Sequence, residues 1–202
     1  AAQKLQPDQL SVTIIDMRNA DKLASGNFRG EAKTYPASVV KLFYLNALER
    51  WLEDGKLQDS AELDRATHDM IVDSNNDATT FVLEALTDAP NGPLLPPDQM
   101  KAREEKRNAV NRYYKSLGYD DINVCQKTYC EGPYGRDAIF LRHGANSNRL
   151  TSNSTARLLS TIVLGKAVTP ARSKLMMELL HRDMNTKSDG PDDQRHGFTA
   201  MI

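Results

Sequence analysis

The stretch from Tyr35 to Leu52 constrains the fold most, because it is apolar around almost its whole circumference. We expect it to form one long helix that begins at Ser38. Pro36 lies just outside that start and favours extended backbone in the residue before it. A helix that is apolar nearly all round is a buried one. The predicted fold is therefore organised around one central helix.

Two polar side chains lie in the first turn of this predicted helix. Ser38 and Lys41 are three residues apart, which places them side by side on one helical face. An unpaired buried ammonium is costly, so such a lysine is paired, or deprotonated for a purpose. A desolvated lysine can act as the base that a serine nucleophile needs. The alternative is that Ser38 only caps the helix and that Lys41 extends to water.

Composition excludes several classes of protein. The chain has 202 residues, with 26 basic and 27 acidic side chains and a net charge of −1. That balance argues against a nucleic-acid partner, which calls for a basic surface. No apolar run is long enough to span a bilayer. The four histidines lack metal-ligand spacing and there is no phosphate-binding loop, so we predict no metal and no cofactor. The sequence does not indicate the oligomeric state.

The two cysteines bear on the compartment. Cys125 and Cys130 are close in sequence, which favours a local disulfide formed in an oxidising environment. Two free buried thiols are the alternative. The chain also opens at Ala1 as a processed product would. We therefore expect a periplasmic or extracellular protein.

Strand patterns occur only near the two ends of the chain. Leu10–Met17 is rich in β-branched residues, and Lys22–Phe28 can return as the second arm of a hairpin. An isolated hairpin is marginal in water, so these strands need a larger sheet. The next strand pattern is Gly197–Ile202, where the sequence stops. We expect the rest of the sheet to lie beyond this sequence.

The region between these strands is predicted to be helical. The hydrophobic period indicates a helix that ends near Val72 and a second one that is capped by Asn76 or Asp77. It also indicates a charged helix over 100–117, a helix over 151–164 and a last helix that begins at 169. Residues 119–150 show no steady period and are expected to form a long ordered loop, a kind of segment that is often functional. The predicted fold class is α/β, in three parts: strands of a sheet domain at 1–34, a helical domain at 35–195, and a return strand at 196–202.

A second motif lies in the turn between two of these helices. Ser74-Asn75-Asn76 could be an ordinary polar turn. Together with Ser38-Val39-Val40-Lys41, however, it resembles the S-x-x-K and S-D-N motifs of the class A β-lactamases and their penicillin-binding relatives, with Asn in place of Asp. The hairpin before Ser38 and the polar helix start at Thr151–Thr155 agree with that family. The resemblance extends from about Leu10 to Leu180.

The resemblance implies a fold in which a helical domain packs on an antiparallel sheet, and it implies roles for four residues. Ser38 would attack the amide carbonyl of a β-lactam or a D-alanyl peptide and form an acyl-enzyme. Lys41 would accept the serine proton, and Ser74 would relay a proton to the leaving nitrogen. Asn76 would bind the acyl-amide oxygen of the substrate. The Ser38 N–H would supply one oxyanion donor.

Besides Asn75 in place of Asp, the sequence departs from the family pattern in three places. It contains no K-T-G strand, and the spacer between Ser38 and Ser74 is shorter than in typical class A enzymes. The glutamate that primes the deacylating water is not found. Glu131 and Asp137 are the available acids, and each is expected to be a surface or turn carboxylate. Two alternatives therefore stay open: a penicillin-binding or DD-peptidase-like protein with little turnover, and a non-catalytic binding module on the same fold.

Overall fold

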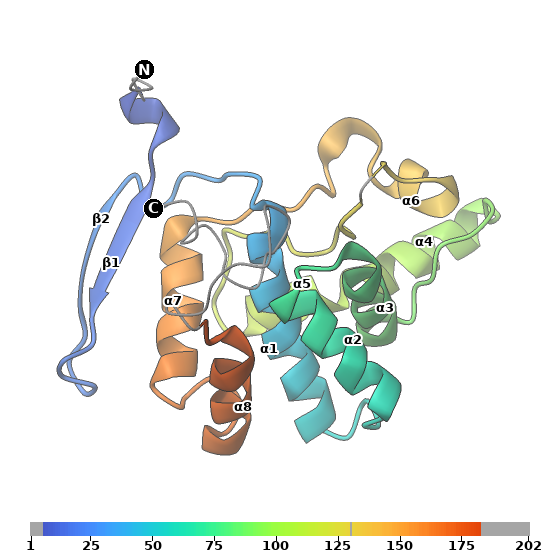
Figure 1. The fold of residues 1–202 in the computed structure, drawn as a ribbon. Helices are drawn as coiled ribbons and strands as arrows, with labels where there is room; N and C mark the ends of the chain where they lie inside the picture. The colour runs from blue at the N-terminus through green and yellow to red at the C-terminus, as the bar shows by residue number, and fades with distance from the viewer. Residues whose placement is uncertain (1–5, 130, 183–202) are drawn as a thin grey trace, which may run out of the picture.

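The computed structural model describes residues 6–129 and 131–182. This part of the chain is mostly helical, with one small antiparallel sheet (Figure 1). Its elements are, in order, β1 (Val12–Asp16), β2 (Ala24–Phe28), α1 (Val40–Glu53), α2 (Ala61–Val72), α3 (Asn76–Thr87), α4 (Pro97–Arg107), α5 (Ala109–Ser116), α6 (Gly135–Phe140), α7 (Ser152–Val163) and α8 (Pro170–Leu180). None of the helices described is both long and apolar enough to cross a bilayer.

Helix α1 is the centre of the helical body, as the sequence predicts. It contacts α2, α3, α5 and α8, and every residue from Val40 to Glu49 is buried. On one side Phe43 packs against Tyr114, with ring centroids 5.0 Å apart. The Tyr114 hydroxyl donates to the Phe43 carbonyl at 2.7 Å, which satisfies a buried polar group. Burying each such aromatic side chain contributes about 1.5–3 kcal/mol.

The start of this helix differs from the prediction. A 3-10 turn spans Ala37–Val39, and α1 begins only at Val40. Ser38 therefore lies in the 3-10 turn and makes no capping hydrogen bond to the helix. The helix ends at Glu53, before Gly55, as expected.

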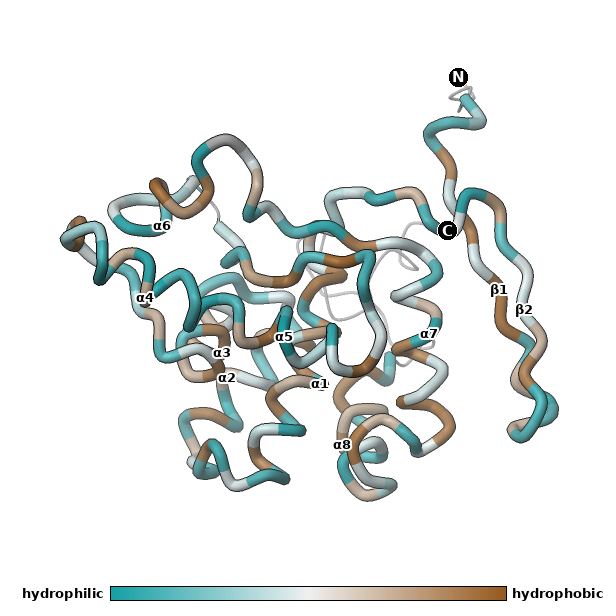
Figure 2. Tube along the Cα trace, turned by 180° about the vertical axis from the view of Figure 1, so that it is seen from behind, coloured by the Kyte–Doolittle hydropathy of each residue, from teal (hydrophilic) through white to brown (hydrophobic). Residues whose placement is uncertain are grey.

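The predicted hairpin is confirmed. Strands β1 and β2 pair antiparallel, with Val12 opposite Phe28. The hairpin stands beside α7 at one side of the molecule (Figure 1). Figure 2 shows hydrophobic positions along β1, the strand that contacts α7. Ile14 is 69% exposed, so a hydrophobic core does not hold this pair of strands.

Polar contacts to the start of α7 hold the hairpin instead. The Thr13 hydroxyl donates to Asn153 Oδ1 at 2.7 Å, and the Asn153 N–H donates to the Gly30 carbonyl at 3.0 Å. A Cβ at Gly30 would lie 2.1 Å from Asn153 Oδ1, so a larger residue there would displace the Asn153 side chain. The predicted return strand at 196–202 lies outside the described residues, and the predicted domain boundaries stay predictions.

Two helix predictions need correction. The charged segment 100–117 forms two helices, α4 and α5, because Asn108 breaks it. The Asn108 side-chain amide donates to the Glu104 carbonyl at 2.9 Å, and asparagine competes in this way with the backbone ladder. The segment 119–150 is not all loop, since α6 lies within it. Its six residues are too few to give a helical period.

The predicted disulfide is not present. Cys125 is a buried free cysteine, and Cys130 lies outside the described residues. The Cys125 thiol donates to Asn123 Oδ1 at 3.0 Å, and burial raises its pKa to about 12. Of the two alternatives, Cys125 therefore fits the buried free thiol.

Candidate active site

Lys41 is the buried centre of the candidate site. Its side chain lies in the first turn of α1, and the residue is only 3% exposed. The Nζ atom donates to Ser74 Oγ at 3.0 Å and to Asn76 Oδ1 at 3.0 Å. It also donates to the backbone carbonyl of Ser74. The structure thus brings together three of the four predicted site residues.

The corner that carries Ser74 is held in an unusual conformation. Ser74 has a φ of 52°, in the left-handed region that costs a non-glycine residue about 1–2 kcal/mol. Asn75 follows as the N-cap of α3, and its Oδ1 accepts from the Ala78 N–H at 2.8 Å. The predicted cap at Asn76 or Asp77 is therefore one or two residues too late. The capped corner turns both the carbonyl and the hydroxyl of Ser74 to Lys41.

The Ser74 hydroxyl can still donate a hydrogen bond through its own proton. Because its oxygen accepts from Lys41, the O–H bond is left to donate elsewhere. A group that accepts from a lysine and donates onward is suited to relay a proton.

Ser38 is the fourth predicted residue, and it is exposed. Among the described residues its hydroxyl makes no hydrogen bond, and its N–H donates to no backbone carbonyl. The alternative that Ser38 only caps the helix is therefore wrong. Ala37, directly before it, has a φ of 45°. Backbone strain of this kind gathers at functional sites, and here it occurs directly before Ser38 and at Ser74 itself. Alanine has no preference for this region, so sequence reasoning did not find the Ala37 feature.

Two helix starts meet at this site. Lys41 lies in the first turn of α1, and Asn76 is the first residue of α3. Helix N-termini carry a partial positive charge, which favours negative charge developing on a substrate oxygen. Lys41 and Asn76 therefore both lie where the partial positive charge of a helix start acts.

The two acids considered for deacylation lie in different environments. Glu131 is exposed, as expected. Asp137 is 1% exposed, so the expectation of a surface carboxylate is wrong for it. Burial alone would raise the pKa of Asp137, but Arg107, Arg103 and Lys127 hold that pKa below its ordinary value. Asp137 thus belongs to a group of mostly buried charges that we call the ion cluster, whose other members are Arg103, Arg107, Lys127 and Glu84. In this cluster Asp137 is poorly placed to activate water.

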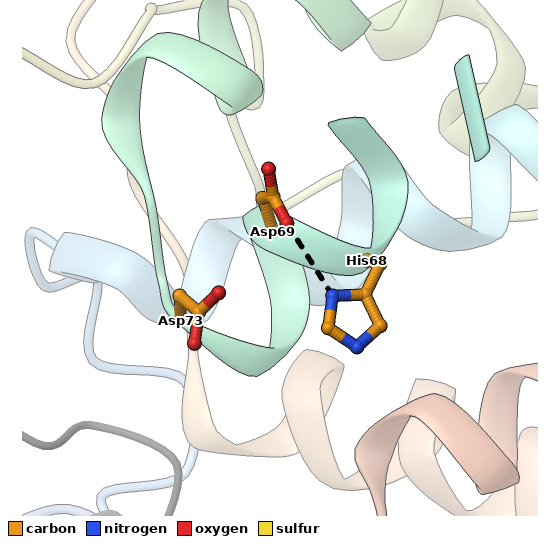
Figure 3. A group of neighbouring side chains, drawn as sticks. All are labelled: His68, Asp69 and Asp73. Carbon is orange, nitrogen blue, oxygen red and sulfur yellow. Dashed lines mark hydrogen bonds and ion pairs between the residues drawn. The ribbon is translucent and has the colours of Figure 1, made fainter. Parts of the chain in front are cut away.

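A further group of side chains lies at the end of α2, just before Ser74 (Figure 3). The ligand atoms of His68, Asp69 and Asp73 lie within 4.8 Å of one another, and His68 Nδ1 is 3.4 Å from Asp69 Oδ1. The group could hold a metal ion, which the histidine spacing did not suggest. His68 and Asp73 are exposed, and such surface groups are common without a metal. We assign the group no role.

At this site a buried lysine bonds a serine and an asparagine at a second helix start, and an exposed serine lies three residues before the lysine in the sequence. The chain belongs to the beta-lactamase enzyme family, whose family model matches residues 61–188, more than half of the chain. The match includes Ser74 and Asn76 and begins after Ser38 and Lys41. No curated protein matches the chain.

Proposed function

We propose that this chain is a serine hydrolase that forms an acyl-enzyme on Ser38 and hydrolyses the amide bond of β-lactams. The observation that carries the proposal is the burial of Lys41 against Ser74 and Asn76. Family membership supports hydrolase chemistry on a small molecule. The acyl-enzyme, the β-lactam substrate and the roles of the individual residues are the proposed part.

In the acylation step, Ser38 Oγ attacks the lactam carbonyl carbon while Lys41 accepts the hydroxyl proton. The Ser38 N–H donates to the carbonyl oxygen as it becomes negative. The carbon–nitrogen bond then breaks, Ser74 gives its proton to the leaving nitrogen, and Lys41 returns a proton to Ser74. Asn76 donates from its amide nitrogen to the acyl-amide oxygen of the substrate. Protons balance, and Ser38 carries the acyl group.

Lys41 suits the role of base because of the oxygens that surround it. Three oxygens that accept from Nζ are a carbonyl, a hydroxyl and an amide oxygen, and these three carry no full charge. Such partners hold the amine in place without fixing a positive charge as strongly as a carboxylate would. The Ser74 hydroxyl, 3.0 Å from Nζ, gives the amine a neighbour with which to exchange a proton.

Release of the acyl group requires a water and a base for it. Asp137 is held by three cationic side chains, and Glu131 is exposed. This arrangement favours the second candidate, a penicillin-binding or DD-peptidase-like protein that is acylated on Ser38 and releases the product slowly. The third candidate, a binding module on the same fold, predicts no covalent step.

A chromogenic cephalosporin separates the three candidates. Continuous hydrolysis over many equivalents supports the β-lactamase, and a burst of one equivalent per chain supports the penicillin-binding protein. Ser38→Ala should abolish either signal. Ser25→Ala, at an exposed position of β2, is the matched control and should leave the signal unchanged. No colour change in a folded wild-type chain would contradict both catalytic proposals and favour the binding module.

Export to the periplasm or the extracellular space also stays a proposal. The free thiol of Cys125 removes the disulfide that first suggested it. Cell fractionation of the producing organism, followed by detection of the chain, tests it directly.

A further inference from the structure

A groove lies between three helices, at the end of α1 that is farther from the candidate active site. Its walls come from the last two turns of α1, from the first half of α2 and from α8 (Figure 1). Glu49, in the α1 wall, is eight residues after Lys41, which is about 12 Å along the helix axis. The groove has a volume of about 400 Å³, at the small end of the range for ligand clefts. Its size therefore suits one small molecule.

Leucines form the apolar part of this groove. They come from all three helices and are Leu48, Leu52, Leu63, Leu175 and Leu179. Leu48 and Leu63 are buried, whereas Leu175 is 47% exposed. Apolar surface that faces water in a hollow is stabilised when a ligand covers it. The groove therefore offers a binding surface to a molecule that has an apolar part.

The charged side chains of the groove are mostly acidic. Four of its lining residues are acids and one is a base, and these are Glu49, Asp59, Asp64, Glu178 and Arg172. We call the groove lined by these five residues and the five leucines the acidic groove. The chain as a whole has a net charge of only −1, so negative charge is concentrated here.

Arg172 does not neutralise the acidic groove. Its Nη1 donates to Glu49 Oε2 at 3.0 Å, and its Nε donates to Glu53 Oε2 at 3.1 Å. Glu53 is not part of the groove lining, so this single cation is shared with an acid outside it. Lys174 lies 3.8 Å from Glu178, but both side chains are exposed and such pairs contribute little. An excess of negative charge therefore remains in the groove.

The pKa values of two acids agree with this excess. Burial raises the pKa of Glu49, Arg172 opposes that rise only in part, and Asp59 and Asp64 add to it. Burial and the adjacent Asp59 raise the pKa of Asp64. A raised carboxyl pKa means that the surroundings disfavour the charged form. A cation in the groove would stabilise both carboxylates.

The arrangement of the acids favours an organic cation over a metal ion. Among the residues that the structure describes, the acids of this groove do not converge closely enough to share a metal ion, as those of His68, Asp69 and Asp73 do at the end of α2. Hard metal ions also require a shell of several oxygen ligands. Walls made largely of leucine do not supply such a shell.

We propose that the acidic groove binds a small organic cation with an apolar stem, such as an alkylammonium ion. The stem would lie against the leucines, and the ammonium group would lie between Glu49 and Asp64. This ligand differs in chemistry from the amide substrate proposed for Ser38, and its binding does not depend on acylation.

Titration of the full chain with hexylammonium chloride tests the proposal, with the leucine methyl groups observed by NMR. The signals of Leu48, Leu63 and Leu175 should shift and saturate with a Kd of about 1 mM or below. Hexan-1-ol has the same stem without a charge, and hexanoate has a negative charge. At one ionic strength, both should bind at least about tenfold more weakly. Equal affinity for hexan-1-ol, or no shifts at these leucines with hexylammonium, would overturn the proposal.

Two matched variants separate the groove from its arginine. Glu49→Gln removes the buried carboxylate and should weaken hexylammonium binding about tenfold. Glu53→Gln removes the other carboxylate that Arg172 bonds, outside the groove, and should leave Kd within about twofold. Equal losses in the two variants would assign the effect to the released arginine and overturn the proposal.

A third variant covers the case in which Glu49→Gln does not fold. Asp64 is exposed, so Asp64→Asn leaves the core intact. This variant should also weaken hexylammonium binding, by about threefold or more, because it removes a second carboxylate from the groove. An unchanged Kd in Asp64→Asn would contradict the proposed position of the ammonium group and overturn the proposal.

Discussion

Two buried cationic centres in this chain are built in opposite ways. At the candidate active site, Lys41 donates to the hydroxyl of Ser74 and to the amide oxygen of Asn76, next to an exposed stretch that carries Ser38. In the ion cluster, Lys127 bonds two carboxylates and lies beside two arginines. A hydroxyl partner can exchange a proton with a lysine, whereas carboxylates fix the positive charge of the lysine. The Lys41 site is therefore suited to proton transfer, and the ion cluster is suited to stabilising the fold.

The largest effect should come from Lys41→Met. Loss of a general base slows a step by about a hundredfold to ten-thousandfold, so acylation by a penicillin should slow by that factor. Stability should change little, because methionine fills a similar volume without a buried amine. Stopped-flow acylation and urea unfolding measure the two effects. A variant that acylates at the wild-type rate would show that Lys41 is not the base.

A substitution in the ion cluster should do the reverse: it should lower stability and leave the acylation rate nearly unchanged. Asp137→Ala leaves the cations of the cluster without their shared partner, which should cost about 3–5 kcal/mol of unfolding free energy. The acylation rate of the folded fraction should stay within about twofold of the wild type, since Asp137 has no proposed part in that step. Urea unfolding checks the first expectation. A loss of unfolding free energy below about 1 kcal/mol would mean that the ion cluster does not stabilise the fold.

The lowered pKa of Asp137 predicts that the stability of the chain depends on pH. The pKa of Asp137 in the folded chain is below its ordinary value of 3.8, so the unfolded chain takes up its proton first as pH falls. The stability that Asp137 contributes is therefore complete above pH 3.8 and is lost as pH drops through the lower, folded value. Urea unfolding at pH 6, 4 and 3 should show this loss in wild type. Asp137→Asn should show a shallower dependence, and an equally steep one would rule out Asp137 as its source.

The smallest effect should come from Ser74→Gly. Glycine adopts a φ of 52° without strain, so the variant should gain up to about 1 kcal/mol in unfolding free energy. It also loses the proposed proton relay, so acylation should slow. Arg29→Gly, at a position with a φ of 53° in the hairpin region, is the matched control and should gain stability without slower acylation. Equal acylation rates in the two variants would argue against the relay.

The sequence predicted the parts of the molecule that depend on periodic patterns. The buried α1 and the β1–β2 hairpin follow directly from such patterns, and the spacing of Ser38, Lys41 and Ser74 suggested the site. The meeting of Lys41 with Ser74 depends on how α1 packs against α3. A resemblance to a family suggested that contact, and periodicity alone did not.

The features that the sequence did not predict depend on single side chains in three dimensions. The break at Asn108 comes from one side-chain hydrogen bond, and the positive φ of Ala37 has no signal in residue type. The ion cluster joins residues from four segments, so Asp137 looked like a turn carboxylate in the sequence. Its three cationic partners become visible only when α4 and α6 lie together.

Peptide mapping of the penicillin-treated chain by mass spectrometry tests the central claim most directly. If the buried amine of Lys41 activates the exposed hydroxyl three residues before it, one acyl group should be found per chain, on the peptide that contains Ser38. A folded chain that carries no acyl group after prolonged exposure, or that carries it on a different residue, would contradict this account.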